Sequence, residues 1–464
     1  MIGPRDGKVL DANSEALGVS IDMLMDNAGK ELAKVVIEHF KGKKILIVCG
    51  VGNNGGDGFA AAYYLKNDFK VTVAMLEDPQ NIKTEASKRR LEMLKLKPKK
   101  FSEVYLVDYD IILDCVLGMG IKGELKPEVA KYVQDLDLFK GTIVAANVPT
   151  GYLTELSVKP HMTVAFHDVK VDMDEMNSGK IVIADIGIPK EAWDCVGPGD
   201  MLRFPVPDND SHKGQNGRLL VIGGGPYVGA PAMAAMAALR VGVDIVRIAT
   251  PKRSFLQVSS MNPSFITHEL SGNILNMDDV PYLLELSEKV DAVLIGPGIG
   301  RAEETVHAVT EFAETCTKPL IVDADAIAFV PATSFNFKIP IIFTPHHREL
   351  EEMLGDNTPE GYIRARGNDI TFVIKGKVDV ITNGMNRREN HSGCAAMTVG
   401  GTGDALSGTI AGLLAKGATV FEAGCLGAYI CGKAGEMAFE EYSYGLTAPD
   451  LIECIPKVLK QHLR

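Results

Sequence analysis

Residues 44–59 read KILIVCGVGNNGGDGF. After Lys44, five apolar residues predict a buried β-strand, the glycines predict a tight turn, and a helix is expected to begin near Asp57. Gly50, Gly52 and Gly55 have the GxGxxG spacing that is typical of dinucleotide-binding folds. Glu77 follows the next expected strand, where such folds carry an acidic residue. A bare GxGxxG fits a structural turn equally well, but the polar Asn53, Asn54 and Asp57 add hydrogen-bond acceptors that a turn does not need and favour a binding site.

The rest of the chain repeats this alternation of short apolar runs and longer amphipathic ones, which predicts parallel sheets covered by helices, an α/β fold. Strands are expected at 44–49, 70–76, 111–115, 142–147, 162–166, 180–184, 219–224, 244–250, 292–296, 320–324, 341–344 and 372–376. Helices are expected near 14–40, 229–241, 304–316 and 404–416. The proline-rich, polar stretch 204–213 separates the two series. We therefore expect one domain over residues 1–204 and a second over residues 205–464.

The composition is that of a globular protein, with 464 residues, 46% of them hydrophobic and 23% charged. The net charge of -12 argues against charge-driven binding of nucleic acid, although backbone N–H groups can still bind a nucleotide phosphate. No apolar run predicts a secretory signal or a membrane span. The eight cysteines form no CxxC pair and mostly lie in apolar runs, which predicts buried thiols and a cytoplasmic protein.

A second glycine-rich turn, GGTGD at 400–404, precedes an amphipathic helix. Such a turn presents consecutive N–H groups to an anion. Asp404 is expected at the start of the helix, where the helix dipole would keep its carboxylate ionised and ready to accept a proton from a substrate hydroxyl. The alternative is that Asp404 only caps the helix, which would not explain the glycine and threonine residues before it.

Further motifs follow expected strands in this half of the chain. GPGIG at 296–300 and TPHHREL at 344–350 come directly after apolar runs, at the strand ends where open α/β sheets bind ligands. VDADA at 322–326 has two readings, since its carboxylates suit either Mg²⁺ or a helix cap. His346, taken alone, is more often a hydrogen-bonded structural histidine than a catalyst.

Five ordered motifs in the first half resemble the NAD(P)H-hydrate epimerase domain, over most of residues 10–200. They are MDNAG at 25–29, GNNGGDGF at 52–59, DCVLGMG at 114–120, NVPTG at 147–151 and TVAFHDVK at 163–170. The resemblance implies a Rossmann-like, three-layer domain that binds a hydrated nicotinamide dinucleotide and interconverts its epimers. It further implies that potassium is held by Asn54, Asp114 and Thr150, whose oxygen atoms suit a hard cation.

The residues that the resemblance assigns to the substrate lie in two segments. They are Asn53, Asn54, Gly55, Gly56 and Asp57 in the first, and Gly118, Met119, Gly120, Ile121, Lys122, Gly123 and Glu124 in the second. Asn147 belongs to the catalytic and substrate-binding set, but the family usually has aspartate there. An amide does not exchange a proton near neutral pH, so this departure predicts poor epimerisation. Lys170 is either a proton donor or nucleotide contact, or a solvated lysine.

Seven ordered motifs in the second half resemble the NAD(P)H-hydrate dehydratase domain of the ribokinase-like superfamily, from about residue 205 onward. They are HKGQNGRLLVIGG (212–224), VGAPAMAA (228–235), GPGIG (296–300), IVDADAI (321–327), TPHHREL (344–350), VIKG (373–376) and SGCAAMTVGGTGDALSG (392–408). The resemblance implies that Ala230, Gly298 and His346 contact the hydrated dinucleotide and that Asp404 acts at the reacting hydroxyl. The adenine nucleotide would contact Lys375, Gly376, Lys377, Val378, Asp379 and Gly403. Arg348 replaces a glycine of the family and is expected to face solvent.

The resemblance thus implies a repair enzyme that dehydrates the S-epimer of hydrated NADH or NADPH with ADP or ATP, with Mg²⁺ and K⁺ as cofactors. Homo-oligomers are implied as well. Three alternatives stay open: a ribokinase-like small-molecule kinase fused to a nucleotide-binding domain, a dehydrogenase using the first glycine motif, and a first domain that binds without catalysis.

Overall fold

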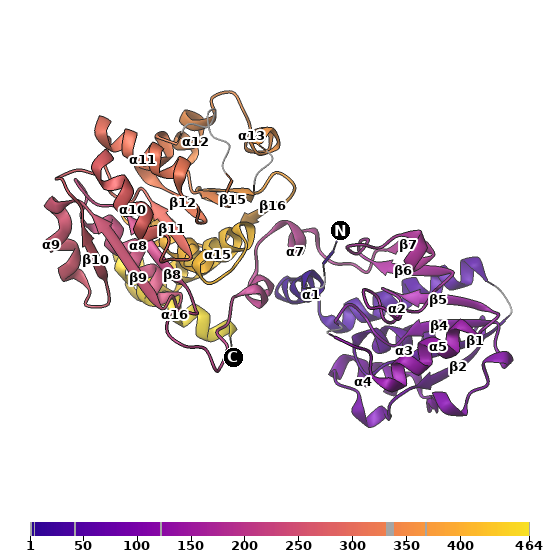
Figure 1. Cartoon of the computed structure of the whole chain (residues 1–464). Coiled ribbons are helices and arrows are strands. Elements are labelled where there is room, and N and C mark those ends of the chain that lie inside the picture. Colours follow the sequence, from indigo (N-terminus) through magenta and orange to yellow (C-terminus); the bar gives the residue numbers. More distant parts are fainter. Residues whose placement is uncertain are drawn as a thin grey trace. The chain divides into compact units, whose positions relative to one another are not determined.

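The structure, a computed structural model, describes residues 2–3, 5–40, 43–120, 123–330, 338–366 and 369–463. It divides into two compact units, Met1–Ala192 and Trp193–Arg464 (Figure 1). Each unit is an α/β fold with helices on both faces of one sheet, as the alternating pattern predicted.

The sheet of the first unit is parallel throughout its described strands, in the order β3-β2-β1-β4-β5-β6-β7. The strands are β1 Lys44–Cys49, β2 Lys70–Met75, β3 Lys99–Lys100, β4 Ile111–Cys115, β5 Thr142–Ala146, β6 Met162–Phe166 and β7 Lys180–Ala184. The six strands expected from sequence are confirmed, and the short edge strand β3 is additional. Because the chain order reverses between β1 and β4, the loops after these strands diverge and leave room for a ligand.

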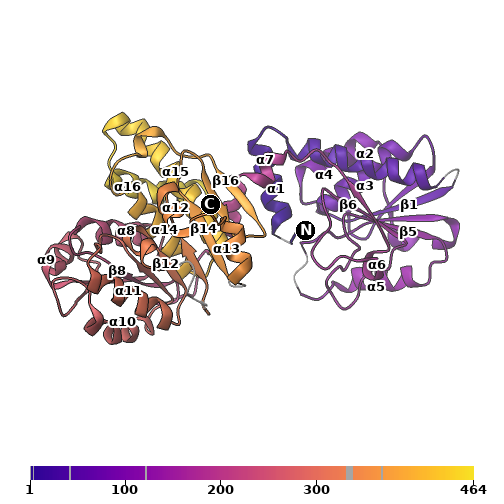
Figure 2. The ribbon, with the colours of Figure 1, turned by 90° about the horizontal axis from the view of Figure 1, so that it is seen from above.

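Helices form the two outer layers of this unit. They are α1 Asp6–Ala16, α2 Ile21–His39, α3 Asn53–Leu65, α4 Glu85–Leu94, α5 Pro127–Asp137, α6 Glu175–Ser178 and α7 Lys190–Asp194. Figure 2 shows α2, α3 and α4 on one side of the sheet and α5 on the other. The single helix expected near 14–40 is wrong: α1 ends at Ala16, Gly18 has a φ of +88°, and Ser20 caps α2 by accepting from the N–H of Met23.

The second unit has a larger, mixed sheet in the order β10-β9-β8-β11-β12-β13-β14-β15-β16. The strands are β8 Arg218–Ile222, β9 Ile245–Thr250, β10 Ile266–Glu269, β11 Ala292–Ile295, β12 Leu320–Val322, β13 Ile341–Phe343, β14 Ile370–Ile374, β15 Asp379–Thr382 and β16 Arg387–Asn390. The pairs up to β14 are parallel, and β15 and β16 add antiparallel at one edge. The strands that the sequence analysis predicted are β8, β9, β11, β12, β13 and β14. It did not predict β10, β15 or β16.

Two helical layers cover this sheet. The helices are α8 Gly229–Arg240, α9 Lys252–Met261, α10 Val280–Ser287, α11 Glu303–Thr315, α12 His347–Leu354, α13 Pro359–Arg366, α14 Thr402–Ala415, α15 Val420–Tyr442 and α16 Ala448–His462. One face packs against α8, α14, α15 and α16, and the other against α10 and α11. The alanines of α8 are buried against α14, so this apolar helix belongs to the core.

The boundary between the units falls at 192/193, before the boundary at 204/205 that composition suggested. The intervening segment is attached to the edge strand β16. The N–H of Val196 donates to the carbonyl of Glu389, and the buried Arg388 pairs with Asp200 at 3.0 Å. Because this ion pair is nearly inaccessible to solvent, removing either partner would leave a buried charge unpaired.

The structure also bears on the expectations about membrane spans and cysteines. Within the described ranges, no helix is long and apolar enough to cross a membrane. All eight cysteines are free, and six of them are buried, which confirms the prediction of buried thiols.

Candidate functional site

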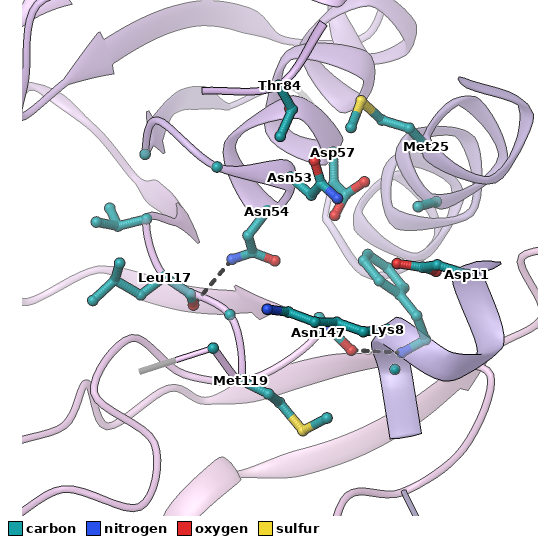
Figure 3. A pocket seen from close by; sticks show the side chains of 18 of the residues that line it. Lys8, Asp11, Met25, Asn53, Asn54, Asp57, Thr84, Leu117, Met119 and Asn147 are labelled. Atoms are coloured by element: carbon teal, nitrogen blue, oxygen red, sulfur yellow. Dashed lines mark hydrogen bonds between the residues drawn. The ribbon is translucent and has the colours of Figure 1, made fainter. Parts of the chain in front are cut away.

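A cavity of about 720 Å³ opens in the first unit where the order of the strands reverses. Its wall is built from the loops after β1 and β4, the start of α3, and the helix α1 (Figure 3). Of the residues expected to contact the substrate, the cavity is lined by Asn53, Asn54, Asp57, Gly118, Met119, Gly120, Glu124 and Asn147. Lys170 and Glu77 line it as well.

The polar residues of the first motif share one helical face. The expected helix start near Asp57 is wrong, because α3 begins at Asn53 with Gly52 as its N-cap. Asn53 and Asn54 therefore each precede Asp57 by about one helical turn, and all three residues line the cavity. The first N–H groups of α3 have no partner within the helix, so this end of α3 is suited to an anion.

The glycines of the same motif serve the close packing of the turn. A Cβ atom on Gly55 would lie 2.0 Å from the carbonyl oxygen of Gly50. A Cβ atom on Gly56 would lie 2.4 Å from the Ser87 hydroxyl. Neither glycine lines the cavity, and their close contacts show that both are needed for the packing of the turn.

The three residues expected to hold potassium are connected through the loop after β4. The Asn54 amide donates to the Leu117 carbonyl at 3.2 Å, and the N–H of Leu117 donates to the Thr150 hydroxyl at 3.0 Å. That hydroxyl in turn donates to Asp114 at 2.7 Å. Asn54 Oδ1 is buried and has no hydrogen-bond partner among the described residues, so this oxygen is available to a cation.

Asn147 lies at the floor of the cavity in the left-handed backbone region, with a φ of +63°. Asparagine tolerates this conformation better than most residues do. Its side-chain oxygen accepts weakly from the N–H of Phe166 at 3.4 Å. Lys170 donates to the carbonyls of Phe166 at 2.5 Å and Asp168 at 2.8 Å, so the solvated alternative for this lysine is wrong. Burial lowers the pKa of Lys170 to about 8.

The remaining expected substrate contacts of the first unit belong to the loop after β4. Gly123 does not line the cavity. Ile121 and Lys122 lie outside the described residues.

One cavity residue was missed by sequence reasoning. Asp11 of α1 lines the cavity, and Figure 3 shows it on the same side as Asp57. A lone aspartate in an amphipathic helix has no sequence signature, and only the docking of α1 brings it to this site.

The candidate site of the second unit lies at the carboxyl ends of its parallel strands and at the start of α14. Gly401 is the N-cap of α14 with a φ of +96°, and Asp404 is the third residue of the helix. The Asp404 carboxylate makes no hydrogen bond among the described residues and so does not cap the helix. The capping alternative is therefore wrong.

Asp404 belongs to a cluster of three charged side chains. Lys375, after β14, donates to the buried Asp323 at 3.0 Å, and the Thr344 hydroxyl donates to the same oxygen at 2.7 Å. Both carboxylates act electrostatically on the Lys375 ammonium. Lys375 also lies beside Gly403, since a Cβ atom there would be 3.7 Å from its Nζ. One ammonium thus lies close to two carboxylates and to the glycine-rich turn.

The protonation of Asp404 differs from the expectation. The helix dipole was expected to keep it ionised, but burial and the neighbouring Asp323 raise the pKa of Asp404 to about 7. Lys375 opposes this rise. Asp323 itself is fully buried, yet Lys375 and Thr344 hold its pKa below the usual value. The cluster thus contains an ionised carboxylate and one that titrates near neutral pH.

The other residues assigned to this site gather around the cluster. The N–H of Lys375 donates to Pro345, directly before His346, and Asp379 accepts from the N–H of Gly376 at 3.1 Å. These contacts shape the β14–β15 hairpin, which contains Lys377 and Val378. In a separate contact, a Cβ atom on Gly298 would lie 3.2 Å from the Cβ atom of Ala230, so the loop after β11 meets the start of α8.

His346 has a structural role that sets its tautomer. It is the N-cap of α12, and its Nδ1 accepts from the N–H of Glu349 at 3.0 Å. This acceptor role places the ring proton on Nε2, which lies 3.5 Å from a Glu349 carboxylate oxygen. Arg348 pairs with Glu352 and is highly exposed, which confirms the expectation that it faces solvent.

Of the two readings of VDADA, the helix cap is wrong. Asp323 pairs with Lys375, while Asp325 pairs with Arg301 at 2.7 Å and accepts from the N–H of Gly300. Neither carboxylate caps the helical turn after β12. Within the described ranges, no three histidine, cysteine, aspartate or glutamate side chains are grouped to hold a metal ion.

Comparison with known proteins agrees with both sites. Residues 219–457 match the family model described as NAD(P)H-hydrate dehydratase, and residues 21–171 match the model described as YjeF-related protein N-terminus. A bifunctional NAD(P)H-hydrate repair enzyme of Methanothermobacter thermautotrophicus is 37% identical over 98% of this chain and 95% of its own length. Another of Archaeoglobus fulgidus is 37% identical over 99% of this chain and 98% of its own.

A solved structure covers the second unit. The ADP/ATP-dependent NAD(P)H-hydrate dehydratase of Bacillus subtilis, co-crystallised with ATP and Mg²⁺, is 26% identical with a TM-score of 0.51. The match covers 58% of this chain and 99% of that protein. The matches to the two relatives extend over both units, and the chain belongs to the family of bifunctional NAD(P)H-hydrate repair enzymes.

Proposed function

We propose that this protein repairs hydrated NADH and NADPH. The second unit dehydrates the S-epimer at the expense of ADP or ATP, and the first unit interconverts the R- and S-epimers. The observation that carries the proposal is the cluster of Asp404, Lys375 and Asp323 at the start of α14. This cluster joins a proton acceptor, a fixed cation and an anion-binding turn, which are the parts that phosphoryl transfer needs.

The chemistry of the second unit follows from that arrangement. Asp404 takes the proton of the C6 hydroxyl of the hydrate as the hydroxyl oxygen attacks the terminal phosphorus of the nucleotide. Phosphate then leaves from C6, assisted by the lone pair of the ring nitrogen N1. Loss of a proton from C5 restores the dihydropyridine ring.

Each member of the cluster has a separate task in this reaction. Lys375, fixed by Asp323, compensates the negative charge of the transferred phosphoryl group, and the N–H groups of the turn bind the nucleotide phosphates. His346 offers its Nε2–H to the dinucleotide. Ala230 and Gly298 have small side chains, which let the start of α8 and the loop after β11 approach closely beside the dinucleotide.

Magnesium fits this site as an ion that arrives with the nucleotide. Mg²⁺ in nucleotide sites is commonly bound by phosphates and water with one or two carboxylates. Asp404 has no hydrogen-bond partner in the described chain and can serve in this way, whereas Lys375 and Thr344 occupy Asp323. The ion would neutralise charge on the phosphates.

Potassium fits the first unit. Among the described residues of this unit, Asn54 Oδ1 is buried and has no hydrogen-bond partner. Hydrogen bonds connect the Asn54 amide to Leu117, Leu117 to the Thr150 hydroxyl, and that hydroxyl to Asp114. We propose that these three residues hold the ion. It would stabilise the loop that runs from β4 over the cavity.

The first unit binds the hydrated dinucleotide in the cavity at the start of α3. Asn147 offers an amide that can orient the ligand but cannot carry a proton. Epimerisation by this unit therefore requires a different proton carrier in the cavity, because the hydroxyl at C6 must leave and return.

The dehydratase assay tests the second unit. Purified protein with the S-epimer of NADH hydrate, Mg²⁺ and either ADP or ATP should restore the absorbance of the reduced nicotinamide. The epimerase assay measures consumption of the R-epimer against its spontaneous rate. If NADH is recovered from the S-epimer but the R-epimer is lost no faster than spontaneously, the first unit only binds the dinucleotide.

Two broader expectations belong to the same proposal. Eight free cysteines are consistent with a reducing compartment such as the cytoplasm. Association of copies of the chain is implied by its resemblance to oligomeric relatives, and light scattering in solution measures it directly.

A further inference from the structure

Two carboxyl groups face the cavity of the first unit from different helices. Asp57 stands on the second turn of α3, and Asp11 stands on α1. Both line the cavity, and the charge of Asp11 acts directly on Asp57. Figure 3 shows their side chains on the side of the cavity opposite the loop that carries Leu117 and Met119.

Folding alone does not account for this pair. Asp57 is only 9% exposed, and neither it nor Asp11 forms a hydrogen bond or ion pair with any described residue. Other buried aspartates have partners: Asp200 and Asp323 form ion pairs, and Asp114 and Asp279 accept hydrogen bonds. A buried polar group without a partner costs free energy, so such groups concentrate where a ligand or a reaction requires them.

A second polar group in the same cavity lacks a partner. Asn54 Oδ1, one helical turn before Asp57, is buried and unpaired, and Asn54 lines the cavity. That oxygen is the one proposed above as a potassium ligand, so the ion would satisfy it, and the two carboxyls remain for the dinucleotide.

The two carboxyls differ in protonation. Burial raises the pKa of Asp57 well above its usual value, and the charge of Asp11 adds to this rise. Burial raises the pKa of Asp11 only to about 6, with a contribution from Glu15. Asp57 thus holds its proton more tightly than Asp11 does. Two carboxyl groups whose pKa values differ in this way can supply one acid and one base.

Other titratable groups line the same cavity from neighbouring elements. Lys8 extends into it from α1, and His167 and Lys170 line it after β6. The thiols of Cys49 and Cys115 lie beneath α3, and burial raises the pKa of both well above the usual value. The thiols are therefore protonated, and Lys170 is occupied by two backbone carbonyls.

We propose that Asp57 and Asp11 are the acid and the base of epimerisation in the first unit. This inference rests on the proposed function. Asp57 donates a proton to the C6 hydroxyl, the C–O bond breaks, and water leaves while the N1 lone pair forms a C6=N1 iminium. A water molecule adds to the other face of C6 and gives its proton to Asp11. A proton returns from Asp11 to Asp57, so no electron is gained or lost.

This assignment removes the need for an acid at residue 147. Asn147 then orients the ring through its amide, while the proton moves on the opposite wall of the cavity. The presence of asparagine at this position becomes compatible with catalysis.

The test compares Asp57→Asn and Asp11→Asn with the full-length wild type and with Asp68→Asn, an exposed control just after α3. The readout is loss of the R-epimer of NADH hydrate at a series of pH values. We expect kcat for epimerisation to fall about 100-fold or more in both cavity variants, with KM changed by roughly threefold at most. Wild-type kcat should rise with pH through about 6, and Asp11→Asn should lose this limb.

Dehydration of the S-epimer by the same samples is the internal control for folding and should be unchanged in all variants. Wild-type epimerisation that persists in both Asp57→Asn and Asp11→Asn would overturn the pair while leaving the proposed function intact. A wild type that does not exceed the spontaneous rate would overturn both. Loss of epimerisation through KM alone would make the pair a binding site and contradict the assignment.

Discussion

Replacing Asp404 by asparagine should abolish dehydration and at the same time stabilise the ligand-free protein above neutral pH. The pKa of Asp404 is raised from 3.8 to about 7 by burial and by Asp323. The folded protein therefore binds this proton more tightly than the unfolded chain does. By linkage, this carboxyl lowers the stability of the wild type progressively as pH rises from about 4 to about 7.

The structure sets the size of this effect. One pKa unit corresponds to about 1.4 kcal/mol, so the two units between pH 5 and pH 7 give a ceiling of about 3 kcal/mol. Solvent reaches part of the side chain and reduces this to on the order of 1–2 kcal/mol. Asparagine has nearly the same shape and no charge, so packing effects cancel when the two pH values are compared.

The assay is urea unfolding of wild type and Asp404→Asn at pH 5 and pH 8, followed by the fluorescence of Trp193, the only tryptophan. The stability advantage of the variant should be larger at pH 8 than at pH 5. Asp356→Asn, at an exposed loop of the same unit, is the control and should show no such change. An equal difference between wild type and Asp404→Asn at both pH values would refute the reasoning, as would a variant that still dehydrates at more than about 1% of the wild-type rate.

Three further substitutions test separate parts of the two sites. Lys375→Met leaves Asp323 buried without its cation and should cost about 3–5 kcal/mol in urea unfolding, with loss of ADP and ATP binding in calorimetry; unchanged nucleotide affinity would contradict the site. Gly55→Ala forces a Cβ atom to 2.0 Å from a backbone oxygen and should abolish epimerisation while dehydration of the S-epimer persists. Asn147→Asp should change the epimerisation rate by less than about threefold; a 100-fold gain would place the proton transfer at residue 147 instead, as sequence reasoning expected.

Sequence reasoning succeeded where short-range chemistry decides the structure. Apolar runs marked the central strands, and glycine-rich turns marked the strand ends where both sites lie. A Gly50–Gly55 contact or a positive φ at Gly401 is a local requirement, so it leaves a local signature.

The misses share one physical cause, which is that they depend on contacts between distant parts of the chain. Asp11 reaches the cavity only because α1 docks there, and Asp323 is identified as a partner of Lys375 only once β12 and β14 lie in one sheet. The expected ionisation of Asp404 considered the dipole of its own helix, but burial and Asp323 outweigh it.

The most direct test of the central claim is the recovery of NADH from its hydrate. The full-length protein is incubated with the purified S-epimer of NADH hydrate, Mg²⁺ and ADP or ATP, while the absorbance of the reduced nicotinamide is recorded. The account predicts that absorbance returns only when a nucleotide is present, with one phosphate released for each NADH formed, and that Asp404→Asn shows no return. Absence of recovery with either nucleotide, or recovery without phosphate release, would contradict it.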